Sequence, residues 1–318
     1  MNALLTFLAV TPLLLLIVLA NLAERAPTMR TPLFLMLGTL NGLTLLVGLG
    51  LTAASATTNP LGSLMLLAGS AVSTALLVPS VRRIAARWLR LHAESAVATT
   101  ALSLTAWALG VNLFQAISLS PLLFERAQQP EVQLQLRQTY LDILVFPLLT
   151  FLLASFLGVG LYTRRTQDEV LQRLGFQRPS WRDAITAALV TPLLVGLALA
   201  TEALWRALDP QGLDRVGGLS RALLGDLRGV TGALAIGVAS ALGEEVFFRG
   251  AYQPRMGIPL TALLFTSFHT QYGITPATAL VFVIGIVLGL VRRYRSLNAA
   301  ISVHFLYNVA VFLLEGTS

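Results

Sequence analysis

The segment GEEVFFRG, at residues 243–250, brings two carboxylates and one guanidinium into an otherwise apolar stretch. Successive residues of an α-helix point about 100° apart, so Glu244 and Glu245 cannot occupy the same helix face. Glu245 and Arg249 have the i,i+4 spacing that favours an ion pair, with the acid nearer the N-terminus. The spacing predicts that Arg249 neutralises Glu245 while Glu244 faces a cavity. The alternative is that all three side chains form one buried ion-pair network that supports the helix end.

Two histidines lie in apolar segments further along the chain. His269 ends the sequence FTSFH, four residues after Phe265, so the phenyl ring can pack beside the imidazole. His304 begins HFLYN, and Asn308 shares its helix face at the i,i+4 position. Because an amide both donates and accepts hydrogen bonds, His304 and Asn308 suit a developing oxyanion. Taken alone, each histidine can equally be a core residue or a bridge between helices.

Together, these motifs favour one catalytic site over separate structural roles. The chain has only three histidines, and two of them follow the glutamate pair on separate apolar segments. Three helices can therefore bring Glu244, His269 and His304 to one point. A carboxylate with imidazoles can activate water as a general base, and one Glu with two His can also bind Zn²⁺.

The elements that must position these residues are membrane helices. Hydrophobic residues make up 55% of the 318 residues and charged residues 12%, compared with roughly 25% charged in a typical soluble domain. The absence of cysteine excludes disulfides, thiolate metal ligands and cysteine nucleophiles. All 22 basic residues are arginines grouped between apolar runs, so the net charge of +7 indicates membrane topology and not a nucleic-acid surface.

The apolar runs predict an all-α integral membrane protein, a polytopic helical bundle of about ten transmembrane segments, with eight to ten allowed. A span needs about 20 residues, so the run at 257–270 is expected to be short, tilted or partly re-entrant. The ten runs cover residues 3–22, 32–54, 61–79, 96–121, 140–162, 185–207, 229–248, 257–270, 274–291 and 297–314.

The connections between these runs alternate in charge. Odd-numbered connections are rich in arginine, including Arg249 and Arg255 in the seventh, whereas even-numbered connections are neutral or mixed. The positive-inside rule places the odd connections in the cytoplasm and both termini outside. In the third connection, residues 81–92 predict either an interfacial amphipathic helix anchored by Trp88 or a solvated topology signal.

Three motifs, in order along the chain, resemble those of a known family. EEVFFR at 244–249, FTSFH at 265–269 and HFLYN at 304–308 are similar to the motifs of the CPBP (CAAX protease and bacteriocin-processing) intramembrane peptidases. That family includes the type II CAAX prenyl endopeptidase. Each motif alone is weakly specific, but the ordered triple on separate membrane segments is strongly specific. The resemblance covers about residues 185–314 and implies an all-helical intramembrane protease core.

The resemblance also implies roles for individual residues. Glu244, His269 and His304 would activate water, and Asn308 would help to polarise the scissile carbonyl. The supporting residues would be Glu245, Arg249 and Phe265.

Metal dependence is the open question about this predicted site. The family has been described both as metalloproteases and as metal-free glutamate peptidases. We favour catalysis without a cofactor, because no protein ligand beyond one Glu and two His is evident. Glu244, His269 and His304 would nevertheless suffice for a divalent metal such as zinc.

Three regions are predicted. Residues 1–162 would form an N-terminal membrane region of about five helices without catalytic motifs. Residues 163–184 would form a cytoplasmic linker, and residues 185–318 would form the peptidase core.

We expect an intramembrane endopeptidase, a hydrolase of a bacterial cell membrane. Its partners would be the lipid bilayer and a membrane-associated or hydrophobic peptide or protein substrate, with no nucleic acid. The motifs do not define an oligomeric state. The alternatives are a non-catalytic immunity or binding protein on the same scaffold, and a transporter or proton relay, for which no inverted repeat is visible.

Overall fold

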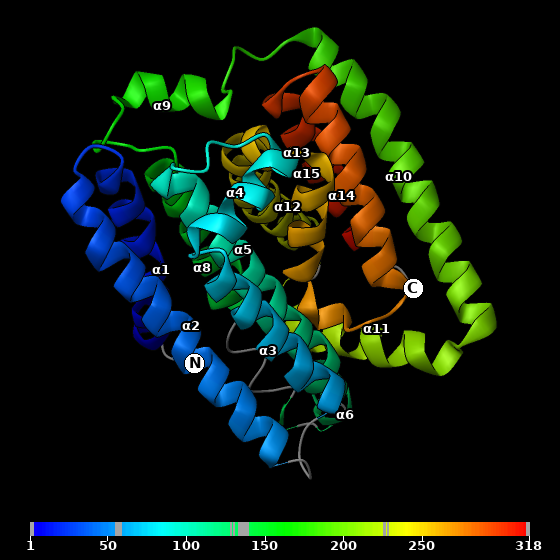
Figure 1. Cartoon of the computed structure of the whole chain (residues 1–318). Coiled ribbons are helices and arrows are strands. Elements are labelled where there is room, and N and C mark those ends of the chain that lie inside the picture. The colour runs from blue at the N-terminus through cyan, green and yellow to red at the C-terminus, as the bar shows by residue number, and fades with distance from the viewer. Residues whose placement is uncertain are drawn as a thin grey trace.

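The computed structural model describes residues 3–54, 59–127, 129, 131–132, 140–224, 227 and 229–315. Within these residues the elements are helices, with no strand, and the predicted all-α membrane protein is confirmed (Figure 1). Six described helices are long and apolar enough to span a membrane, and a bent pair, Pro60–Ala75 with Pro79–Leu89, would add a seventh. The described parts of all ten predicted runs are helical or nearly so, and the number of spans, about ten, stays a prediction.

The first half of the chain forms one set of helices. They are α1 (Ala3–Ala23), η1 (Pro27–Met29), α2 (Arg30–Ala53), α3 (Pro60–Ala75), α4 (Pro79–Leu89), α5 (Ala96–Phe114), η2 (Gln115–Leu119), α6 (Ser120–Arg126) and α8 (Tyr140–Gly158).

The second half follows a short polar helix. Its elements are α9 (Gln167–Leu174), α10 (Trp181–Leu208), α11 (Pro210–Leu224), α12 (Val230–Glu245), η3 (Val246–Tyr252), α13 (Gln253–Ser267), η4 (Thr270–Tyr272), α14 (Pro276–Tyr294) and α15 (Leu297–Glu315).

Local sequence explains several helix boundaries. Asn59 caps α3 by accepting a hydrogen bond from the Leu61 amide, and Pro60 follows as the first helical residue. Thr166 and Glu169 form a capping box at the start of α9, and Gly175 ends that helix in a left-handed conformation. These signals place the connections between the apolar runs.

Helix α4 corresponds to the amphipathic stretch predicted at 81–92. It is bent by 98° from α3, so the two helices cannot both run along one membrane normal. Arg82 is buried, whereas Trp88 is 85% exposed. An interfacial helix anchored by Trp88 fits this arrangement.

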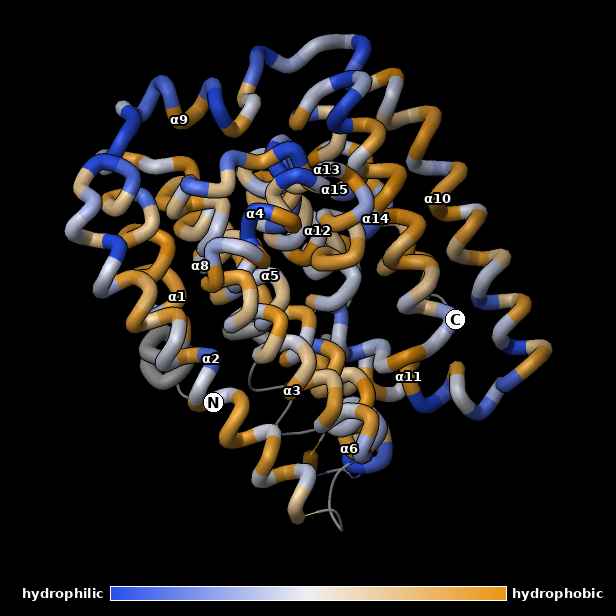
Figure 2. The backbone as a smooth tube through the Cα atoms, viewed as in Figure 1, coloured by the Kyte–Doolittle hydropathy of each residue, from blue (hydrophilic) through white to orange (hydrophobic). Residues whose placement is uncertain are grey.

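The predicted odd-numbered connections meet at one end of the bundle, which we call the arginine-rich end. It carries α4 and α9. Figure 2 shows many hydrophilic residues at this end and mainly hydrophobic residues along the helices below it. Side chains at this end donate hydrogen bonds to backbone carbonyls of other connections. The contacts are Arg30 to Glu94 (3.1 Å), Arg25 to Arg164 (3.2 Å) and Arg292 to Leu174 (3.4 Å).

Described parts of the even-numbered connections meet at the opposite end. Ser120 Oγ, just before the fourth connection, donates over 2.6 Å to the carbonyl of Thr270, just before the eighth. Ser118 Oγ, near the end of the run that precedes the fourth connection, contacts the carbonyl of Asn59 in the second at 3.5 Å. The alternation in charge along the sequence therefore corresponds to two separate ends of the fold.

The prediction that Arg249 lies in a seventh connection is wrong, whereas Arg255 lies two residues before a break in the helix at Gly257. Residues Val230–Ser267 form one helical stretch of 38 residues, and the π-helix η3 continues α12 without a loop. Arg249 is fully buried because it pairs with a buried acid and does not need water. The break in this stretch is at Gly257, whose φ of 76° suits a residue without a Cβ atom.

The two halves pack directly against each other. Helix α8 contacts both α1 and α12, and α12 contacts α15. The hydroxyls of Thr105 in α5 and Tyr252 in η3 lie 2.7 Å apart. Residues 163–184 contain α9, but the division into regions 1–162, 163–184 and 185–318 remains a prediction.

Candidate active site

The end of α12 carries the buried ion pair. Glu245 is the last residue of α12 and Arg249 lies in η3, and both side chains are 0% exposed. Arg249 Nη1 donates to Glu245 Oε1 over 3.0 Å, at the predicted i,i+4 spacing. Because a buried charge is costly unless it is paired, each residue makes the other tolerable in the membrane.

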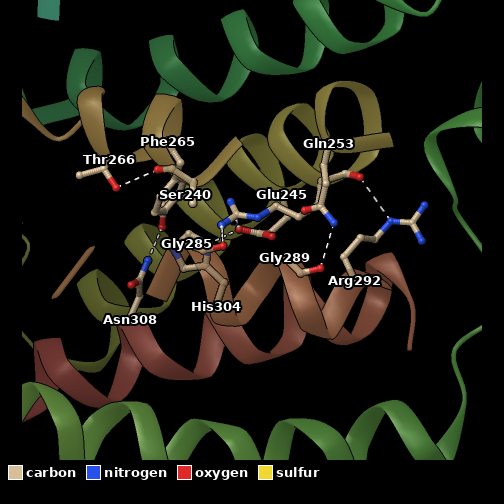
Figure 3. Close-up of polar contacts among 12 residues, drawn as sticks. Ser240, Glu245, Gln253, Phe265, Thr266, Gly285, Gly289, Arg292, His304 and Asn308 are labelled. Atoms are coloured by element: carbon tan, nitrogen blue, oxygen red, sulfur yellow. Dashed lines mark hydrogen bonds and ion pairs between the residues drawn. The ribbon is translucent and has the colours of Figure 1, made fainter. Parts of the chain in front are cut away.

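His304 joins this pair from α15. Its Nδ1 lies 2.8 Å from Glu245 Oε1, the same oxygen that Arg249 binds (Figure 3). The sequence prediction placed His304 with Glu244, whereas the structure places it against Glu245. The alternative of a buried network around Glu245 is therefore partly realised, with His304 as its third member.

Phe265 lies between the charged groups and both histidines. The Arg249 guanidinium carbon is 4.3 Å from the centre of the Phe265 ring, a cation–π contact. The ring centre is 4.8 Å from that of His269 and 6.1 Å from that of His304. Arg249 Nη2 also donates to the Gly285 carbonyl over 3.1 Å, so α14 helps to hold the guanidinium.

Glu244 is placed differently from its neighbour. Its side chain is partly exposed, but Oε2 is buried and has no hydrogen-bond partner among the described residues. Glu245 Oε2 is also unpaired, although Arg249 and His304 both bind its other oxygen. Glu244 therefore lacks the ion pair that neutralises Glu245.

Asn308 of α15 contacts α12 at Ser240, one helical turn before Glu244. Its Nδ2 donates to Ser240 Oγ over 2.7 Å, and Ser240 donates to the Ile236 carbonyl over 2.6 Å. Ser240 and Glu244 are spaced i,i+4 and share a face of α12. The sequence analysis did not single out Ser240. The pattern that could have identified it is a hydroxyl residue four positions before Glu244, on the same helix face.

The close packing of α12 on α15 depends on Gly237. A Cβ atom there would lie 2.8 Å from Val309 Cγ2 and 2.9 Å from Phe305 Cδ2. The missing side chain lets α15 approach, which allows His304 and Asn308 to contact α12.

His269 lies just beyond the end of α13, at the start of η4. Its Nδ1 is 3.0 Å from the Phe265 carbonyl oxygen. Since a carbonyl only accepts, Nδ1 carries the proton, and Nε2 of the neutral ring is then the basic nitrogen. His269 also lines a cavity of about 190 Å³, together with Leu109, Leu113 and Leu263. Helix α5 of the first half therefore contributes to this cavity.

The predicted metal ligands do not form a metal site in this arrangement. Among the residues that the structure describes, no group of three His, Cys, Asp or Glu side chains could hold a metal ion. Glu244, His269 and His304 thus do not fit a three-ligand zinc centre as placed here.

Comparison with known families adds an independent finding. Residues 226–310 match the family model described as type II CAAX prenyl endopeptidase Rce1-like. Comparison with curated proteins gives no match, and comparison with solved structures gives none. The matched segment contains all three motifs. The predicted resemblance is confirmed, because residues 226–310 are similar to the type II CAAX prenyl endopeptidase Rce1-like family.

Proposed function

We propose that this integral membrane protein is an endopeptidase that hydrolyses a peptide bond of a membrane-associated or hydrophobic substrate. Glu244 and His269 activate the attacking water, and His304 and Asn308 stabilise the tetrahedral intermediate. The observation that carries the proposal is that the adjacent carboxylates Glu244 and Glu245 differ in their partners. Arg249 and His304 bind Glu245, whereas Glu244 makes no ion pair with a described residue.

Water activation needs a base whose acceptor atom is not already used. The unpaired Glu244 Oε2 meets this requirement, because a buried carboxylate oxygen gains most from a water hydrogen bond. His269 Nε2 is the second acceptor, since its Nδ1 is bound to the Phe265 carbonyl. A positioned general base contributes about 10²–10⁴ to a rate.

Oxyanion stabilisation needs donors that are held in place before the reaction. Ser240 uses one N–H of the Asn308 amide, and the other N–H remains for the substrate oxygen. Glu245 accepts from His304 Nδ1 and holds the ring in place, and Nε2 would donate to the substrate oxygen when the ring carries a second proton. A pair of fixed donors matches what acyl-transfer enzymes use for a developing oxyanion.

The cavity beside His269 supports a hydrophobic substrate. Its volume is about 190 Å³ and its lining is mostly apolar, with Asn112 and Ser267 among its polar members. Such a cavity suits an apolar side chain next to the scissile bond. The matched family motifs support a catalytic core and carry no information on the substrate, so the proposal names only this substrate class.

We also propose a location and an orientation. The protein would lie in a bacterial cell membrane with its arginine-rich end in the cytoplasm and both termini outside. The arginine asymmetry between the two ends supports this orientation. Reporter fusions within residues 163–184 should give a cytoplasmic signal, and an external signal there would reverse the proposed orientation.

The test of function is a comparison of membrane-derived peptides from cells that make the wild type or Glu244→Gln. The proposal predicts peptides that appear only with the wild type and an uncleaved precursor that accumulates with the variant. The matched control is Glu202→Gln, because Glu202 is partly exposed on α10 and pairs there with Arg206. Identical peptide sets for wild type and Glu244→Gln would favour a binding protein or a transporter instead.

A further inference from the structure

A group of arginines at the arginine-rich end is not used by the proposed chemistry. They come from different parts of the sequence, namely the connection after α1, the connection after α8, helix α9, the start of α13 and the end of α14. We call them the arginine cluster; its members are Arg25, Arg164, Arg165, Arg173, Arg255 and Arg292.

Contacts to the backbone hold the cluster together. Arg25 Nη2 donates to the Arg164 carbonyl over 3.2 Å, and Arg173 Nη1 lies 3.5 Å from the Gly250 carbonyl. Arg292 links this group to η3, where its Nε donates to the Arg249 carbonyl over 3.3 Å (Figure 3). The remaining members, Arg165 and Arg255, lie close enough to Arg173 for their charges to interact.

Acidic side chains do not neutralise the cluster. Within the described part of the chain, none of the six arginines forms an ion pair. The carboxylates that interact with it, Glu24 and Glu169, are already engaged. Glu24 accepts hydrogen bonds from Ser95 and the Val97 amide, and Glu169 caps α9. The cluster therefore keeps a large excess of positive charge.

The cluster also differs from a solvated topology signal. All its members except Arg25 are partly buried, and Arg164 Nε and Nη2 are buried without a hydrogen-bond partner among the described residues. Burial lowers the pKa of Arg164 and of Arg173, and neighbouring arginines lower both further. Guanidinium groups that are desolvated and mutually repelling are stabilised by a bound anion.

Aromatic side chains indicate the depth of this end in the membrane. Trp88 is 85% exposed, Tyr162 82%, Tyr294 72% and Trp181 70%, and all four lie in or beside the odd-numbered connections. Tyr and Trp collect at the level of lipid headgroups, where an apolar ring and a polar edge are both satisfied. The arginine cluster thus lies at the level where lipid phosphates are found.

We propose that the arginine cluster is a binding site for the phosphate of an anionic phospholipid headgroup. The planar guanidinium group binds phosphate oxygens in pairs, and the exposed and partly exposed members of the cluster supply the donors. The aromatic side chains favour a lipid over free phosphate, because they place the site where headgroups are concentrated. The inference does not depend on the proposed peptidase activity.

The test uses the full-length protein in a neutral detergent, titrated with phosphatidylglycerol, phosphatidylcholine or inorganic phosphate and followed by native mass spectrometry. Each arginine near a membrane surface contributes about fivefold to the affinity for anionic lipid. Arg164→Gln and Arg255→Gln should each weaken phosphatidylglycerol binding by about this factor. The matched control, Arg87→Gln, removes an exposed arginine of α4 at the same end and should leave binding unchanged.

The outcomes are distinct. The proposal requires that the wild type bind phosphatidylglycerol at least about tenfold more tightly than phosphatidylcholine, as expected when two or more arginines contribute. Equal affinities in the wild type would overturn it, whether or not the variants fold. An equal loss in Arg87→Gln would also overturn it, because the effect would then be general surface charge. Inorganic phosphate that binds alone and displaces the lipid would assign the site to a free anion and overturn the lipid source.

Discussion

The helices before and after residues 163–184 bury different kinds of polar group. In the first half, the charged groups that make contacts, such as Glu24 and Arg82, lie at the arginine-rich end, and deeper contacts between described residues are made by neutral groups. Ser73 and Ser103, both fully buried, share a hydrogen bond of 2.7 Å. In the second half, Glu245, Arg249 and His304 meet at the centre of the bundle.

This difference separates helix packing from chemistry. Neutral hydrogen bonds between membrane helices contribute only about 0.6 kcal/mol on average, because the separated helices find other partners. A buried charge has no such substitute, so the loss of its partner leaves a large penalty. The second half therefore depends on a complete set of partners, and the first half does not.

The largest expected effect on stability is in the second half. Arg249→Ala leaves Glu245 buried with only His304 as a partner, and breaking such a pair typically costs about 3–5 kcal/mol. Folded yield and thermal stability in detergent should fall accordingly. The double variant Glu245→Gln with Arg249→Met removes both charges and should recover part of the loss. No recovery would contradict mutual neutralisation.

The next largest expected effect is on the rate of peptide cleavage, in variants of Asn308 and Ser240 that keep their stability. Asn308→Ala removes one proposed oxyanion donor and should lower the cleavage rate about 10²–10³-fold. Ser240→Ala keeps the amide but loses its anchor, so a smaller decrease is expected. If Ser240→Ala were the more damaging of the two, Asn308 would not be the group that contacts the substrate. Purified variants with equal thermal stability provide this comparison.

A change in the first half should be much milder. Ser73→Ala removes the hydrogen bond to Ser103 and should lower stability by about 0.6 kcal/mol, with activity unchanged. Thermal unfolding in detergent measures the first quantity and peptide cleavage the second. A loss as large as that of Arg249→Ala would remove the distinction between the two halves.

Zinc chelators are expected to leave the rate of peptide cleavage unchanged. The described side chains do not assemble a three-ligand metal site, so the proposed chemistry of the second half relies on its own charges. Cleavage should be the same before and after dialysis against a strong zinc chelator. Lost activity that returns on addition of Zn²⁺ would show that Glu244, His269 and His304 rearrange around a metal.

The sequence predicts contacts within a helix better than contacts between helices. The spacing of Glu245 and Arg249 is enough to predict their contact, because helix geometry fixes i,i+4 neighbours. The partner of His304 depends on how α15 is aligned with α12, and periodicity carries no information on that alignment. The choice between Glu244 and Glu245 therefore required the structure.

One further difference between the sequence prediction and the structure, the position of a helix break, has a local physical cause. The predicted break before residue 257 rests on the charges of Arg249 and Arg255, yet a buried partner allows Arg249 to remain inside the helix. The actual break occurs at Gly257, where a positive φ needs glycine. The arginine-rich end, in contrast, follows from charge alternation alone, because each connection lies at one end or the other.

The central claim is that Glu244 and His269 act as one unit on water. The most direct measurement is the rate of peptide cleavage by folded Glu244→Gln, His269→Ala and the double variant, with a substrate identified from the wild type. Glu244→Gln should lower the rate about 10²–10⁴-fold, and adding His269→Ala should cost little more, because groups acting together lose activity non-additively. Full activity in folded Glu244→Gln would contradict the account, and multiplicative losses would show that the two residues act separately.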